Sequence, residues 1–515
     1  MGTVSVLYVE EQRKCTITQI YHLQNEKMIQ LNDQELILVT ISVAILAMLW
    51  YKLTLSSSSN GAPSLPPGPR SLPVVGYLPF LSPDLHKQFT NMANTYGPIF
   101  KFYLGMSKLY VVINTPELAK AVVRDQDEAF SNRDQTVAAS IISYGCQDLV
   151  VSKNNSHWRK LRKIFVHEVM SSKSLEACGC FRRDQVRKTI MNVFSNIGTP
   201  INISEIAFMT EANVITSMIF DTTLDHFGDS FGAELQMVSA KIVEIFGQPN
   251  LSDFFPSLAR FDLQGIERDM KKQRDKLDNI FTSIIEERIK SSSTKSQDGV
   301  GQDNGKKDFL QILLDLKDKE GPTSLNITQI KALILDIMIA GTETTATLIE
   351  WAMAEIIRDH RVMKKIQEEL SSIVGVNNHV QESHLPKLQY LDAAVKETFR
   401  LHPVLPFIFP RVPSQDCIVG GYTIPKGISM FLNVWSIHRD PRYWDNPLEF
   451  TPERFLTCEG IKQWDYKGNN SKFFPFGSGR RLCPGIPLAE KMQVFILASL
   501  LHLFDWSLPE GEEHD

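Results

Sequence analysis

A long apolar segment in the second half of the chain limits the possible folds most strongly. From about residue 325 to residue 357 the sequence is apolar nearly all round and contains no proline. A helix of roughly thirty residues would be about 45 Å long, and a helix without a polar face has to lie inside a domain. The segment therefore predicts a large, mainly α-helical domain built around one buried central helix.

Length and composition are those of a globular protein. The chain has 515 residues, 43% of them hydrophobic and 22% charged, with a formal net charge of -5. These values exclude a disordered chain, a collagen and a small disulfide scaffold. A mildly acidic protein gives no electrostatic reason to expect a nucleic-acid partner. Seven scattered cysteines without a C-x-x-C pair favour a reducing compartment and argue against a zinc ribbon or covalent c-type haem attachment.

Two short segments add a β component. Residues 99–104 and 109–113 read IFKFYL and LYVVI, compositions that favour strands. Residues 291–307 are rich in serine, glycine and charge and predict a surface loop between two helices. The expected fold class is therefore mainly α with small β-sheets.

A second apolar run, near the N-terminus, predicts a membrane anchor. Residues 36–51 carry no charge and lie between Glu35 and Lys52. Their helical rise of about 24 Å is slightly short of a hydrocarbon core of roughly 30 Å, but the next apolar residues can extend it. No basic region directly precedes the run, which argues against a cleaved signal. We expect a single transmembrane helix over residues 35–55 rather than a signal or a core helix.

The segments around the anchor complete the domain organisation. Residues 1–34 are polar and aperiodic, so we expect an unstructured extension, with Met28 as an alternative translation start. Residues 56–72 are rich first in serine and then in proline, which predicts a linker that becomes stiffer along its length. Residues 73–515 form the large domain. Basic residues after the anchor favour the cytosolic side of the membrane.

Polar residues interrupt the central helix at Ala340–Thr345. A carboxylate, Glu343, and three threonine hydroxyls are costly in an apolar helix unless they serve each other, water or a ligand. Gly341 weakens the helix but allows close approach to its backbone. Either a ligand contact or a set of internally satisfied hydroxyls beside a packing contact explains this segment.

A glycine-rich segment near the C-terminus presents one cysteine. Residues 473–485 read FFPFGSGRRLCPG and precede an apolar helical run. The glycines allow a tight turn, which places Cys483 at a helix N-terminus where free N–H groups and the helix dipole stabilise a thiolate. Arg481 adds a positive charge and Phe476 an aromatic flank. This pattern suits the axial thiolate ligand of a haem iron; a buried structural cysteine is the alternative.

The cysteine segment resembles the signature of a known superfamily. Its spacing F-x-x-G-x-R-x-C-x-G, formed by Phe476, Gly479, Arg481, Cys483 and Gly485, resembles the haem-thiolate signature of cytochromes P450. The resemblance implies haem b as cofactor, with Cys483 as the ligand of the iron and Phe476, Arg481 and Gly485 in contact with haem.

Further motifs of the family follow in the expected order. Trp158 and Arg162 resemble the W-x-x-x-R pair that reaches a haem propionate, and Arg411 resembles another propionate contact. Residues 340–345 resemble the oxygen-activating helix, in which Glu343 and Thr344 would relay protons.

Two other segments resemble the motifs of a structural network. Glu397 and Arg400 have the spacing of the E-x-x-R motif, and Arg454 lies in a P-E-R-F segment. The resemblance implies a buried network of these three residues that supports the haem-facing core.

The family resemblance also predicts the activity and the partners. The phrases AGTETT, PFGSGRRLCPG and KETFRLHP look most like the plant A-type microsomal group, which includes terpenoid hydroxylases and flavonoid 3'-monooxygenases. This implies a monooxygenase that inserts one atom of O2 into a small apolar substrate, a terpenoid first and a flavonoid or phenylpropanoid second. The implied partners are an NADPH-cytochrome P450 reductase, cytochrome b5 as a second candidate donor, and the lipid of the endoplasmic reticulum membrane, with the catalytic domain on the cytosolic face.

Two alternative functions stay open at this point. Family members continue past the equivalent of Trp506 with a β-hairpin, and we expect this domain to lack it, which raises the hypothesis of a catalytically weak isoform or a non-catalytic haem-binding partner. A haem-thiolate isomerase or dehydratase would need no external electrons. The pair Glu343 and Thr344 argues against the latter, because such an enzyme has no need of a proton relay.

Overall fold

The computed structural model describes residues 37–38, 40–42, 45, 64–106, 108–228, 230–297, 308–317, 324–456 and 464–509. It divides into two units, residues 1–62 and 63–515. The described residues of the first unit are helical, and their isoleucine and leucine side chains are exposed. The rest of the predicted anchor, the extension 1–34 and the first part of the linker, residues 56–63, lie outside the described residues.

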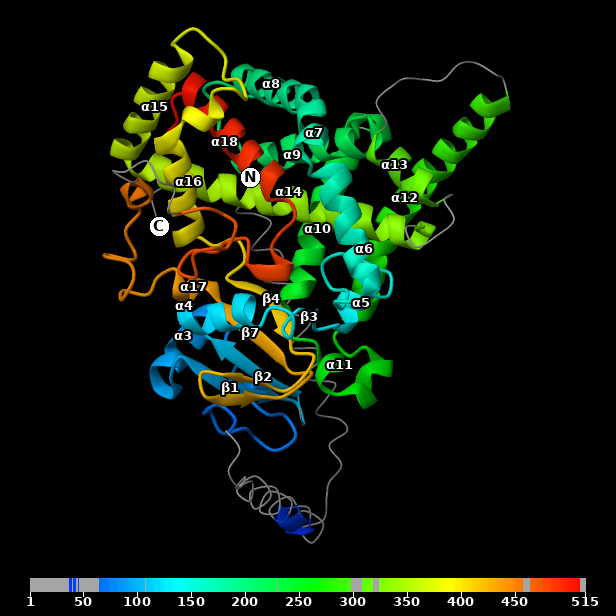
Figure 1. Ribbon diagram of the computed structural model, residues 1–515, viewed down its shortest axis with the longest axis vertical. Coiled ribbons are helices and arrows are strands. Elements are labelled where there is room, and N and C mark those ends of the chain that lie inside the picture. The colour runs from blue at the N-terminus through cyan, green and yellow to red at the C-terminus, as the bar shows by residue number, and fades with distance from the viewer. Residues whose placement is uncertain are drawn as a thin grey trace, which may run out of the picture. The chain divides into compact units, whose positions relative to one another are not determined.

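The larger unit is mainly helical, as the sequence predicts (Figure 1). The helices of its first half are α3 (Leu85–Tyr96), α4 (Pro116–Lys120), α5 (Val137–Ile142), α6 (Ser156–Ile164), α7 (Ser172–Ala177), α8 (Gly179–Ser195), α9 (Ile203–Phe220), α10 (Phe231–Gly247) and α11 (Leu251–Phe254). Those of its second half are α12 (Ile266–Gln297), α13 (Phe309–Lys317), α14 (Ile327–Arg358), α15 (His360–Val374), α16 (Gln389–Leu401), α17 (Val434–Ile437) and α18 (Ile486–Leu503). Short 3-10 or π turns are η2 (Leu78–Phe80), η3 (Ala121–Asp125), η4 (Phe165–Val169), η5 (Leu224–Phe227), η6 (Pro256–Phe261), η7 (Leu385–Lys387), η8 (Pro452–Phe455) and η9 (Gly479–Arg481).

Two small sheets complete the domain. The larger has the strand order β1 (Ile99–Leu104), β2 (Lys108–Ile113), β7 (Ser429–Asn433), β4 (Phe407–Val412) and β3 (Asn132–Arg133). The smaller pairs β5 (Cys417–Val419) with β6 (Tyr422–Ile424). The two strands predicted from sequence are confirmed as β1 and β2, which form an antiparallel hairpin.

The predicted central helix is α14, which crosses the helical part of the domain (Figure 1). A capping box formed by Asn326 and Gln329 fixes its start. It packs against α9 and α18, and α8 contacts both of these helices. A Cβ atom at Gly341 would lie 2.4 Å from the Cδ1 atom of Ile215 on α9, so glycine lets the two helices pack closely here.

Two other features qualify what the sequence predicted. The loop expected over residues 291–307 starts later, because α12 continues through Gln297; a long helix propagates through serine and lysine at little cost once it is nucleated. Among the described residues, α9, α14 and α18 are each long and apolar enough to cross a membrane. All three pack inside the domain, where their apolar surface forms the core.

Candidate functional site

The cysteine lies at the end of a tight loop, directly ahead of α18. The Cys483 backbone N–H donates a hydrogen bond to the carbonyl of Phe476 at 3.0 Å. The backbone turns through positive φ at Gly477 (75°) and Gly479 (68°). A Cβ atom at Gly479 would lie 2.0 Å from the carbonyl oxygen of Val123, so this position requires glycine both for its φ and for the close approach.

The start of α18 influences the pKa of the Cys483 thiol. Burial raises the pKa of Cys483, while the backbone N–H groups of Gly485 and Ile486 and the positive charge of Arg162 act in the opposite direction. The groups that favour the thiolate are therefore the helix N-terminus predicted from sequence and a cation. Arg162 also donates to the carbonyl of Leu482 at 2.6 Å, which fixes it beside the cysteine loop.

Cys483 faces a cavity of about 270 Å³ in the middle of the domain. Gly341 and Thr344 of α14 line it, as do Phe476 and Gly485 of the cysteine segment. The motif of the cysteine loop and the polar segment of the central helix, which are far apart in sequence, thus meet at one space.

Four arginines from separate segments line this cavity. They are Arg133 of β3, Arg162 of α6, Arg411 of β4 and Arg481 of η9. In the described part of the chain none of the four pairs with a carboxylate. Burial, together with neighbouring guanidinium groups, lowers the pKa of Arg411 to about 10 and that of Arg481 to about 9, while the charges of Asp127 and Asp148 act in the opposite direction.

The arrangement of these arginines indicates a binding site for an anionic group. Arg133 lies directly opposite Arg411 in the β3–β4 ladder, and like charges in opposite positions destabilise a sheet. Arg411 is 1% exposed, and its Nε and Nη1 atoms have no hydrogen-bond partner. Leaving buried charged donors unsatisfied is costly, so the site is complete only when an anionic group binds here.

Trp158 does not line the cavity in the described structure. Its indole N–H donates to the carbonyl of Leu149 at 3.0 Å, and its ring lies 4.1 Å from the guanidinium carbon of Arg481. Its only side-chain donor is thus used within the protein. Trp158 supports Arg481 by a cation–π contact, whereas Arg162, its partner in the motif, lines the cavity itself.

Glu397, Arg400 and Arg454 form a separate buried network. Arg400 binds Glu397 through two hydrogen bonds of 2.7 Å, and both side chains are fully buried. Arg454 reaches the same carboxylate at 3.2 Å. Arg400 also donates to the carbonyl of His438 at 2.9 Å, and the Nε2 atom of His438 accepts the Phe474 N–H at 3.3 Å. His438 thereby connects the network to the segment that carries the cysteine.

The two predicted relay residues differ in their surroundings. The Thr344 hydroxyl lines the cavity and donates to the carbonyl of Ala340 at 2.7 Å, which leaves its lone pairs free to accept. Glu343 does not line the cavity in the described structure. Burial raises its pKa to about 6, and its Oε1 atom is buried without a partner.

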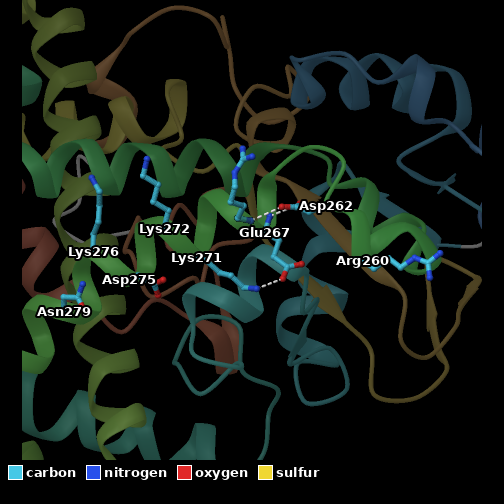
Figure 2. Close-up of a pocket in the computed structure, with 9 residues that line it drawn as sticks. Arg260, Asp262, Glu267, Lys271, Lys272, Asp275, Lys276 and Asn279 are labelled. Carbon is cyan, nitrogen blue, oxygen red and sulfur yellow. Dashed lines mark hydrogen bonds and ion pairs between the residues drawn. The ribbon is translucent and has the colours of Figure 1, made fainter. Parts of the chain in front are cut away.

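A second depression lies on the surface of α12 and η6 (Figure 2). It is larger, about 670 Å³, but open, and its walls are charged side chains such as Lys271 and Glu267, which pair with each other. It offers neither an enclosed apolar space nor a nucleophile or soft metal ligand. The cavity at Cys483 is therefore the candidate active site.

Comparisons with known proteins agree with this geometry. The family model described as Cytochrome P450 matches residues 66–515. The chain belongs to the cytochrome P450 family. A flavonoid 3',5'-hydroxylase of Solanum melongena is 36% identical over 477 residues, 92% of this chain and 91% of the relative. A carnosic acid synthase of Salvia pomifera is 34% identical over 484 residues, 93% and 94% of the two chains, and cytochrome P450 76C1 of Arabidopsis thaliana is 37% identical over 457 residues, 88% and 87%.

Solved structures show the same fold. A zebra fish cytochrome P450 with progesterone has a TM-score of 0.70 and 24% sequence identity, and the match covers 84% of this chain and 95% of that chain. The fold class predicted from sequence, mainly α with small sheets, is thus confirmed for the larger unit of this cytochrome P450.

The residues of the cavity fit the haem-thiolate cofactor of the family. Cys483 offers a soft sulfur ligand for the iron, and the unpartnered donors of Arg411 suit a carboxylate such as a haem propionate. Arg162 and Arg481, both predicted, line the same cavity, as does Arg133. Four unpaired cations are more than enough for two propionates.

Sequence reasoning missed Arg133. It stands in a short strand without a motif, and only the pairing of β3 with β4 brings it beside Arg411. Leu149 and Val150, which follow α5, also line the cavity, whereas no residue of α5 itself does. The reason is that α5 packs against α12, so the following loop forms the wall.

Proposed function

We propose that this cytochrome P450 hydroxylates or epoxidises a small apolar substrate, a terpenoid in the first place and a flavonoid or phenylpropanoid in the second. The observation that supports this best is that Cys483 faces a cavity whose remaining wall is largely aliphatic and aromatic. An apolar lining with few polar groups favours an apolar ligand. Its members are Leu149, Val150, Leu333, Ile337, Val404, Leu405, Ile408 and Phe409.

The relatives support the same range of substrates. Their names include flavonoid hydroxylases and carnosic acid synthase, and all of them lie at similar identity to this chain. Identity of this order does not distinguish the substrates, so the ranking depends on the lining of the cavity. The cavity is less apolar than its sequence suggested, because Glu211 and Asp336 also line it.

The residues at this site have separate roles in binding the cofactor and in moving protons. Haem, when bound, supplies the iron chemistry that activates O2. Arg411 and its neighbours would hold the cofactor's carboxylates, and Cys483 would supply a thiolate stabilised by the start of α18. Thr344 accepts and donates hydrogen bonds at the cavity wall. Glu343, with a pKa near 6, exchanges a proton at neutral pH and can supply the Thr344 hydroxyl through ordered water.

The proposed partners follow from the family. Electrons come from a membrane-bound NADPH-cytochrome P450 reductase, with cytochrome b5 as a second candidate donor. Anchoring of residues 35–55 in the endoplasmic reticulum membrane, with the large domain on the cytosolic side, would place the enzyme beside this reductase and in contact with apolar substrates dissolved in lipid.

The experiment that tests this proposal is a substrate screen in membranes. The full chain is combined with a plant reductase and offered a panel of terpenoids and flavonoids, and products are analysed by mass spectrometry. We expect products that contain one additional oxygen atom and whose formation requires NADPH. Conversion without NADPH or O2 would instead indicate an isomerase or dehydratase. The Thr344→Ala variant is expected to consume NADPH but release more hydrogen peroxide; unchanged coupling would contradict the relay role.

A further inference from the structure

A five-residue loop supports the basic side chains around the cavity. We call residues 148–152 the cradle loop. The Leu149 carbonyl accepts from the Trp158 indole at 3.0 Å and from Arg481 at 3.3 Å. Arg133 donates to the next carbonyl along the loop at 3.2 Å. Two of the cavity arginines, Arg133 and Arg481, are therefore held partly by peptide carbonyls of this loop rather than by carboxylates.

Two carboxyl groups, those of Asp148 and Asp336, accept hydrogen bonds from backbone N–H groups of the same loop. Asp148 accepts the backbone N–H groups two, three and four residues further on, at 3.2, 3.0 and 3.0 Å. The N–H of Leu149 donates to the Oδ2 atom of Asp336 at 2.7 Å. Asp336 comes from α14, one turn ahead of Ala340. It is the described link between the cradle loop and the helix that carries Thr344.

The surroundings of Asp336 favour a neutral carboxyl. Its side chain lines the cavity beside apolar residues, and Asp148, its neighbour, is 2% exposed. Burial raises the pKa of Asp336 well above its usual range, and the negative charge of Asp148 raises it further. Two buried carboxyls at one site cannot both ionise without a large cost, so one proton stays on the pair.

We propose that Asp336 is a positioning residue of the haem site: as a hydrogen-bond acceptor on the central helix it fixes the cradle loop and thereby orients Arg133 and Arg481 toward the cofactor. The proposal depends on haem binding and on no choice of substrate. Without this acceptor the Leu149 N–H would be left unsatisfied in the cavity wall, and the carbonyl that holds Trp158 and Arg481 would lose its fixed direction.

The test compares an isosteric with an apolar replacement. Asp336→Asn keeps an oxygen that accepts the Leu149 N–H, whereas Asp336→Leu removes it. Haem-loaded full-length protein is mixed with excess apomyoglobin, and haem transfer is followed by absorbance. Loss of a buried acceptor should speed the transfer by about tenfold or more in Asp336→Leu, while Asp336→Asn should stay within about threefold of the parent chain. Glu350→Leu, at an exposed position of the same helix, is the control.

The outcomes separate the proposal from its alternatives. Equal haem loss from Asp336→Leu and the parent chain would show that Asp148 alone fixes the loop, and would overturn the proposal. Equally fast loss from Asp336→Asn and Asp336→Leu would show that a charge is needed, and would overturn it as well. If Asp336→Leu does not fold, Asp336→Ala removes the same acceptor without added bulk, and the same ranking is expected. Because no substrate is used, failure here leaves the proposed reaction untouched.

Discussion

A buried acid in the core gives the most quantitative prediction. Glu211 of α9 is 1% exposed, lines the cavity, and its Oε1 atom has no hydrogen-bond partner. Gln493 of α18 lines the same cavity, and its Oε1 atom is also without a partner. Burial raises the pKa of Glu211 to about 8, an effect that Arg182 reduces. Arg182 is itself engaged by Glu382 at 2.8 Å.

The sign of the pH effect follows from this raised pKa. Between the unfolded value of 4.5 and the folded value of about 8, the folded state binds more protons than the unfolded state, so the free energy of unfolding falls as the pH rises. A fully shifted group contributes about 1.4 kcal/mol per pH unit. Between pH 5.5 and pH 7.5 the parent chain should therefore lose about 2.5 kcal/mol relative to a Glu211→Gln variant, in which the side chain is neutral at every pH.

The measurement is urea unfolding of the haem-bound full chain in detergent at these two pH values. Absorbance of haem and tryptophan fluorescence report on the transition, and only coincident transitions are used. Glu350→Gln, an exposed position of α14, controls for the general effect of removing a carboxylate. We expect the stability difference between parent and Glu211→Gln to grow with pH and to close again toward pH 4.5. Parallel pH profiles would refute the raised pKa and the burial that causes it.

Three further predictions address the site and its support. Arg411→Leu removes the guanidinium with unpartnered donors, so the haem content of purified protein should fall severalfold while the fold, followed by circular dichroism, is retained; full haem content would contradict its role. Arg400→Leu leaves the Glu397 carboxylate buried with only part of its partners, which should cost about 3–5 kcal/mol and abolish soluble haem-bound protein on expression; normal yield would contradict this. Gly479→Ala places a methyl group against a backbone oxygen and should reduce thiolate-ligated haem more than Gly477→Ala, whose added Cβ would meet no atom closer than 3.9 Å; equal effects would show that backbone strain alone matters.

Local spacing in the sequence was enough to predict the cysteine loop. Phe476, Arg481 and Cys483 are close in sequence, so a turn and a helix start determine much of their geometry. The central helix could be predicted equally well, because an apolar run of that length has few alternatives to burial. The contact of Glu397 with Arg400 needs only one helical turn.

Other parts of the site depend on tertiary contacts that no local pattern encodes. Arg133 reaches Arg411 through a pairing between strands distant in sequence. Glu211 lies in a helix that carries a second acid, Glu205, and whether each faces solvent or the cavity depends on how α9 packs. The motif of Trp158 predicts a contact with a haem propionate, whereas in the described structure its indole N–H donates to the Leu149 carbonyl of the cradle loop.

The central claim is that Cys483 binds haem iron through its thiolate in the described cavity. The most direct test is the carbon monoxide difference spectrum of membranes that contain the reduced full chain, recorded beside a Cys483→Ser variant. We predict a strongly red-shifted Soret band for the parent chain and its loss in Cys483→Ser, since a hydroxyl is a hard and weakly donating ligand. An unchanged red-shifted band in the serine variant would contradict the assignment of the ligand.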